Sequence, residues 1–67
     1  MTGYTTATEA QVLAGAKAMH RAFEMRAERR HNGYYTRQTW EQIDQPCRDE
    51  FINYVRPALD AALQETA

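Results

Sequence analysis

The chain is poor in residues that staple or break a fold: its 67 residues include one cysteine, two prolines and three glycines. With Cys47 alone, no disulfide can form within the chain, and a lone thiol is typical of a reducing compartment. No apolar stretch approaches the roughly 20 residues that a membrane-spanning helix needs. Residues 1–6 also lack the basic region and apolar run of a secretory signal. We therefore expect a cytoplasmic protein with no membrane partner.

Residues that carry chemistry are equally scarce. The soft metal ligands are His20, His31 and Cys47, which show neither a His-x3-His nor a Cys-x2-Cys spacing. A helical chain of this length can hardly enclose a substrate pocket. We therefore predict a non-enzymatic protein without catalytic residues, metal, cofactor or small-molecule substrate. In this interpretation His20 and Cys47 are packed side chains.

An apolar stripe at helical spacing runs through the first half of the chain. It predicts one long helix from about Glu9 to about His31. Gly15 costs this helix about 1 kcal/mol relative to alanine, but the missing side chain would let another helix approach closely. The stripe consists of Val12, Ala16, Met19, Phe23 and Ala27, flanked by Leu13 and His20.

Both ends of this helix carry sequence signals. Thr6-x-x-Glu9 and Thr8-x-x-Gln11 are two overlapping capping boxes, in which the threonine hydroxyl accepts a free backbone N–H and the third residue on reaches back. At the other end, Asn32-Gly33 stops the helix because glycine readily takes the left-handed conformation there.

A second helical region fills the C-terminal third. Thr39 suits the N-cap of a short corner helix from Trp40 to about Ile43, whose two apolar side chains would plug one end of the core. Asp44 then caps a longer helix that begins at Pro46 or Cys47 and runs towards Gln64. Pro57 interrupts it and predicts a kink or break near residues 53–56. Its apolar positions are Cys47, Phe51, Ile52, Val55, Leu59, Ala62 and Leu63.

These elements predict an all-α fold without strands or repeats. The long N-terminal helix, the corner helix and the Pro-kinked C-terminal helix would form a small helical hairpin or bundle. Residues 1–8 are predicted to be a flexible N-terminal tail and residues 9–67 a single helical domain. Chains this short bury only about 60% of their unfolded surface, so they often need a partner subunit.

Charge is segregated along the chain. Residues 17–37 hold six cations and two acids, a net +4, whereas residues 38–67 hold two cations and six acids, a net −4. Glu9 accounts for the remaining charge of the whole chain, −1. The interpretation we favour is that the basic and acidic helices lie side by side and neutralise each other. The alternative is a basic binding face.

Two binding functions compete for the region around the end of the first helix. Many large side chains for so small a body favour a protein-interaction module, with a homodimer as its simplest form. Clustered arginines and tyrosines instead suggest nucleic-acid binding, because arginine pairs with phosphates and tyrosine stacks on bases. The predicted partner-binding residues are Met25, Arg26, Arg29, Arg30, Tyr34, Tyr35 and Arg37.

Three segments carry a resemblance to known sequences: residues 16–23, residues 40–43, and the stretch that contains Arg48-x-x-Phe51 and residues 56–62. Together they resemble short reading frames of actinobacterial phages and prophages, which have an Ala-rich helix with a central histidine, a Trp-x-x-Leu/Ile corner and an Arg-x-x-aromatic helix. The resemblance implies a small all-helical phage accessory protein that acts on a host or phage protein in the host cytoplasm. Pro57 and the Arg/Tyr-rich loop depart from that pattern.

Overall fold

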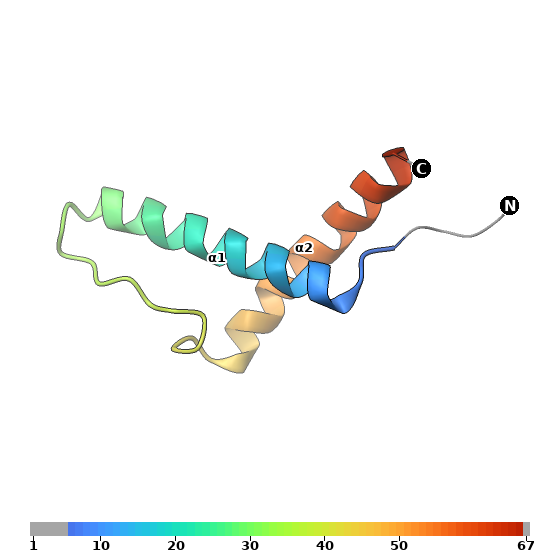
Figure 1. The fold of residues 1–67 in the computed structure, drawn as a ribbon. Helices are drawn as coiled ribbons and strands as arrows, with labels where there is room; N and C mark the ends of the chain where they lie inside the picture. The colour runs from blue at the N-terminus through green and yellow to red at the C-terminus, as the bar shows by residue number, and fades with distance from the viewer. Residues whose placement is uncertain (1–5, 67) are drawn as a thin grey trace, which may run out of the picture.

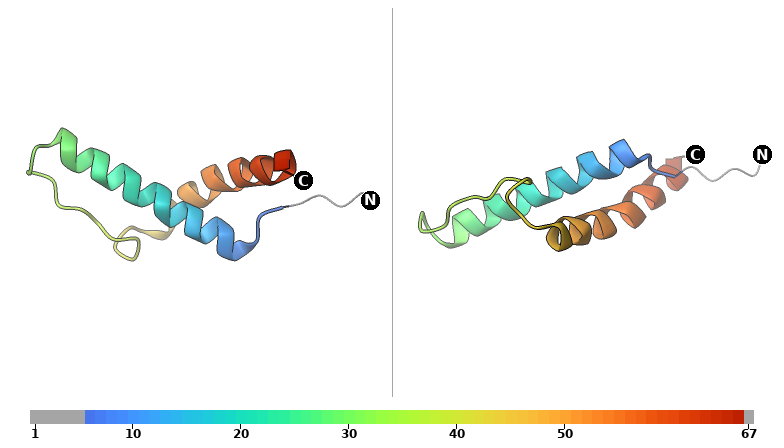
Figure 2. Two further views of the ribbon diagram at one scale, coloured as in Figure 1. Left: turned by 45° about the horizontal axis from the view of Figure 1, so that its top comes forward. Right: turned by 90° about the horizontal axis from the view of Figure 1, so that it is seen from below.

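The computed structural model describes residues 6–66 and contains two helices, α1 (Glu9–Arg30) and α2 (Gln45–Thr66). They run in opposite directions and cross near the N-terminal half of α1, so that the C-terminal end of α1 extends past α2 and lies beside the linker, residues 31–44 (Figures 1 and 2). No strand is present in the described range. The predicted all-α hairpin is therefore confirmed at the level of two helices.

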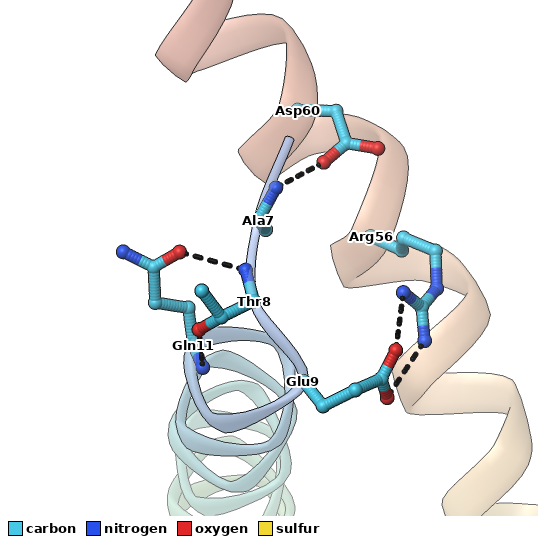
Figure 3. Close-up of polar contacts among 6 residues, drawn as sticks. All are labelled: Ala7, Thr8, Glu9, Gln11, Arg56 and Asp60. Atoms are coloured by element: carbon cyan, nitrogen blue, oxygen red, sulfur yellow. Dashed lines mark hydrogen bonds and ion pairs between the residues drawn. The ribbon is translucent and has the colours of Figure 1, made fainter. Parts of the chain in front are cut away.

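Local signals set both ends of α1. Of the two possible capping boxes, the structure forms the one at Thr8: its Oγ1 accepts the Gln11 amide at 3.1 Å, and the Gln11 side chain accepts the Thr8 amide at 2.9 Å (Figure 3). After the C-cap His31, Asn32 and Gly33 both have positive φ, 49° and 89°. The Tyr34 amide donates to the His31 carbonyl at 3.0 Å, so Asn32-Gly33 forms the tight turn that such a pair favours.

The predicted corner helix is wrong in its extent. Residues 40–42 form a single turn, in which the Gln42 amide donates to the Thr39 carbonyl at 3.1 Å. Asp44 already caps α2 through the Cys47 amide, which leaves no room for a longer helix. The packing role is confirmed: Ile43 is buried and Trp40 packs against the core.

Helix α2 begins one residue earlier than predicted and is continuous across Pro57. The predicted break is therefore absent, whereas the kink stays a prediction. Proline removes the donor for the Asn53 carbonyl. Because Asn53 and Pro57 are both exposed, water can hydrate that carbonyl. This explains how the helix tolerates the proline.

The helices touch most closely at Gly15. A Cβ at this position would lie 2.8 Å from Val55 Cγ1 and 3.3 Å from Leu59 Cδ1, which is closer than ordinary van der Waals contact. Val12 and Ala16, one turn apart on the same side of α1, are almost completely buried. The predicted close approach at Gly15 is confirmed.

Polar contacts close this end of the hairpin (Figure 3). The Ala7 amide donates to Asp60 Oδ1 at 2.7 Å, and Arg56 holds the Glu9 carboxylate with two contacts, at 3.1 and 3.3 Å. The guanidinium lowers the pKa of Glu9 through this hydrogen bond and its charge. Of the predicted flexible tail, residues 1–5 lie outside the described range, whereas Ala7 and Thr8 have defined partners.

The hydrophobic core is small. Its buried apolar side chains are Val12, Ala16, Ile43, Phe51 and Val55. Met19, Trp40, Cys47, Ile52 and Leu59 cover it in part. Only part of the apolar stripe of α1 is buried in this core. Phe23, which the pattern places in the core, is 48% exposed.

Candidate protein-interaction surface

Helix α1 extends past its crossing with α2 (Figure 1), and Phe23 of its apolar stripe is 48% exposed. The Phe23 ring contacts the edge of the core through Phe51, with ring centroids 5.4 Å apart and a 66° angle between the planes. About half of the Phe23 side chain nevertheless remains exposed. A half-covered aromatic ring at the end of a core is a common anchor in protein interfaces.

Three arginines surround this ring. Phe23, Arg26 and Arg30 recur at intervals of three and four, so they share one side of α1, and together with Ala27 and His31 they line one hollow. Arg29 joins Phe23 and Arg26 in the neighbouring hollow. None of the three arginines has a hydrogen-bond or ion-pair partner among residues 6–66. We call Phe23, Arg26, Arg29 and Arg30 the Phe23 surface.

The linker returns along another side of α1, where two glutamates hold it. Glu24 accepts the Tyr35 hydroxyl at 2.6 and 2.8 Å and the Gln38 amide at 2.5 Å, while Glu28 pairs with Arg37 at 2.7 Å. Desolvation alone would raise the pKa of Glu24, but the hydrogen bonds from Tyr35 and Gln38 and the charge of Arg37 bring it below its usual value. The hydrogen bond between Tyr35 and Glu24 raises the pKa of Tyr35.

The predicted partner-binding residues therefore separate into two groups. Arg26, Arg29 and Arg30 lie together around Phe23, whereas Tyr35 and Arg37 hold the linker in place. Tyr34 is 95% exposed in the turn after α1. Met25 is two positions from Phe23, about 200° around the helix, and so lies on the opposite side of α1.

The predicted partner-binding residues do not include Phe23, although it is one of the large side chains that a two-helix core cannot all cover. Sequence reasoning also missed the two glutamates as anchors for the linker. Phe23 fits the apolar stripe, and periodicity does not reveal where the second helix leaves the first. Glu24 and Glu28 are four positions apart on α1, so their shared side of the helix could have been noticed. That these glutamates bind residues 35–38 could not have been noticed from the sequence.

The basic and acidic halves of the chain do not pair with each other directly. The ion pairs of the described residues are Arg37–Glu28, within the basic segment, and Arg56–Glu9, at the closed end. None joins a cation of residues 17–37 to an acid of residues 38–67. The favoured interpretation of mutual neutralisation is therefore wrong for direct contacts, because the basic end of α1 extends past the crossing (Figure 1).

A further hollow of about 330 Å3 lies between α1 and the linker. It is lined by Lys17, His20, Arg21, Glu24 and residues 37–41. His20, predicted as a packed side chain, is 6% exposed, and its ring contacts Trp40 and Phe51 edge to face at 5.8 and 5.5 Å. Its Nε2 has no hydrogen-bond partner. An N–H of the His20 ring directed at an aromatic face would compensate part of the free energy lost with the missing hydrogen bond.

Other chemistry has little support in the described part of the chain. Among those residues, no three His, Cys, Asp or Glu side chains gather where they could hold a metal ion. Burial raises the pKa of the Cys47 thiol, and the charges of Asp44 and Glu50 raise it further. The thiolate, which is the reactive form of cysteine, is thus disfavoured. Neither α1 nor α2 is long and apolar enough to cross a membrane.

No protein-family model matches the chain, and no match is found among curated proteins or solved structures.

Proposed function

We propose that this protein is a non-enzymatic interaction module that docks on another protein through the Phe23 surface. One observation carries the proposal: a half-exposed phenylalanine extends the core of the hairpin and is surrounded by three arginines without internal partners. Aromatic residues and arginine are the side chains that contribute most to protein interfaces. The resemblance to phage accessory proteins agrees with such a role and suggests a host or phage protein as the target.

Nucleic-acid binding through the same arginines is the second candidate. Arg26, Arg29 and Arg30 are exposed and unpaired, and Tyr34 is available for stacking. Two of the residues predicted for this function are already occupied, however, because Tyr35 bonds to Glu24 and Arg37 pairs with Glu28. The aromatic ring at the centre of the surface also favours a protein partner.

Salt dependence distinguishes the two candidates. If three arginines each neutralised one phosphate of duplex DNA, a rise from 50 to 200 mM salt would weaken binding about 40-fold. Docking centred on Phe23 would lose much less, because burial of an apolar ring is not screened by salt.

The experiment is a pull-down from actinobacterial lysate with the tagged protein, with and without nuclease. We expect a discrete protein that remains bound after nuclease and is lost with Phe23→Ser. Leu13→Ser is the matched control, because Leu13 is also an exposed apolar residue of α1 (40%) but lies outside the Phe23 surface. Retention that disappears with nuclease and with Arg29→Gln/Arg30→Gln would support nucleic-acid binding instead.

A further inference from the structure

An acidic aromatic surface lies on α2, next to the Phe23 surface. Glu50, Asn53 and Tyr54 line a hollow there, and their spacing of three and four residues places them on one side of the helix. Tyr54 is 67% exposed. Glu50 has no hydrogen-bond or ion-pair partner among the described residues. This surface combines an unpaired negative charge with an exposed ring.

The two surfaces flank the same aromatic contact. Phe23 belongs to the first and touches Phe51, and Phe51 follows Glu50 directly and precedes Tyr54 by three positions on α2. Glu50 is about 100° and Tyr54 about 60° from Phe51 around α2, on the same flank of that helix. A partner that covers the exposed half of Phe23 would reach both residues across that flank. It would meet unpaired arginines on one side of this contact and the Glu50 carboxylate on the other.

A second copy of the chain carries both an acidic group for the arginines and a basic group for Glu50. In a twofold-symmetric contact, each copy presents its basic surface to the acidic surface of the other, so both attractions form at once. The Phe23 surface carries three arginines and the acidic surface carries Glu50, so their charges are opposite in sign. The net charge of −1 gives little repulsion between copies. Any other partner would need to carry the same pattern independently.

We propose that the protein forms a twofold-symmetric homodimer in which the Phe23 surface of each copy docks on Glu50 and Tyr54 of the other, with Arg26 opposite Glu50. This inference rests on the proposed function, and it names a second copy of the chain, in place of a host or phage protein, as the partner of the same surface. The two Phe23 rings are buried near the symmetry axis. The interface thus completes the core that a single hairpin leaves open.

Charge reversal tests the pairing between copies. Sedimentation equilibrium should show a dimer for the wild type. Arg26→Glu and Glu50→Arg should each bring like charges together at both contacts and weaken the dimer about tenfold or more. In an equimolar mixture of the two variants, every contact again joins opposite charges, so a mixed dimer should form. Rescue by mixing requires contacts between chains, which an effect within one chain cannot provide.

Arg21→Glu and Glu41→Arg are the matched control pair. Both residues are exposed and lie outside the proposed interface, and the substitutions change the net charge by the same amounts. Each control variant should remain as dimeric as the wild type. Circular dichroism verifies that every variant is helical, and Arg26→Gln with Glu50→Gln replaces any charge reversal that unfolds.

Three results would overturn the inference: a wild type that stays monomeric up to about 1 mM, single reversals that leave the dimer intact, or a mixture that does not reassociate. A monomeric wild type that still retains a protein through Phe23 in the pull-down would overturn the homodimer alone. A wild type that neither dimerises nor retains a protein through Phe23 would also overturn the proposed function.

Discussion

The two ends of the hairpin are built from side chains of different size. At the closed end, Val12, Gly15 and Ala16 let α2 approach so closely that Gly15 has no space for a Cβ. One to two turns later, the same side of α1 carries the rings of His20 and Phe23, which contact Phe51 of α2 at centroid distances of 5.5 and 5.4 Å. Small residues thus allow close contact between the helices at one end, whereas ring contacts join them at the other. The open end is held by polar contacts of the linker.

This difference has a consequence for binding. At the closed end, Val12 and Ala16 are almost completely buried within one chain. At the open end, Phe23 and the arginines are positioned on a regular helix but remain uncovered. A surface on a rigid helix loses little conformational entropy when it binds, which supports the proposal that the open end is the docking site.

Truncation of the two phenylalanines in contact should give the largest difference between the ends. Phe51→Ala should cost about 3 kcal/mol, because Phe51 is 9% exposed and belongs to the buried core. A chain of this length has only about 3–10 kcal/mol of stability, so the variant should lose about a third of its stability or more. Phe23→Ala should cost about 1 kcal/mol at concentrations too low for self-association. Thermal unfolding followed by circular dichroism measures both, and equal losses would contradict the distinction between closed and open ends.

Overpacking at the crossing should give the next largest effect. Gly15→Leu should lower the free energy of unfolding by about 2 kcal/mol, because the new side chain must displace Val55 and Leu59, which outweighs the gain in helix propensity. Ala14→Leu is the control, since Ala14 is exposed on the same turn of α1. Urea unfolding of both variants provides the comparison. A Gly15→Leu variant as stable as Ala14→Leu would mean that the helices are not in close contact there.

The smallest effect should come from the polar contacts at the open end. Tyr35→Phe removes a hydrogen bond that lowers the pKa of Glu24, so the pKa of Glu24 should rise in this variant. Tyr34→Phe, at the adjacent exposed position, should leave it unchanged. NMR titration of the Glu24 carboxyl group measures the shift, and equal values in all three proteins would exclude the Tyr35 contact in solution.

The pKa of Glu24 also fixes the sign of its pH dependence. Because its pKa is lower in the folded state, its contribution to stability is complete above the ordinary glutamate value, 4.5, and is lost as the pH falls through the lowered value. Glu24→Gln should therefore reduce stability near neutral pH and have progressively less effect in acid. A difference in stability between the wild type and Glu24→Gln that stays constant from neutral to acid pH would contradict the lowered pKa of Glu24.

Sequence reasoning located the arginine cluster but not its centre. Arg26, Arg29 and Arg30 are recognisable as an exposed group at the end of a helix. The sequence predicts that Tyr35 and Arg37 bind a partner, because no local pattern reveals that Glu24 and Glu28 bind them within the chain. The corner helix was overestimated for a related reason: the Thr39 capping signal is real, but Asp44 starts α2 before a helix can extend.

The sequence by itself determined the two long helices and, to within two residues, their ends, because capping, periodicity and the Asn32-Gly33 turn act between residues a few positions apart. Only the tertiary structure decided which part of the apolar stripe is buried, since this depends on where α2 crosses α1. That crossing is set by Gly15 and Val55, 40 positions apart in the chain. The same crossing leaves Arg26, Arg29 and Arg30 at the end of α1 without acidic partners among residues 6–66.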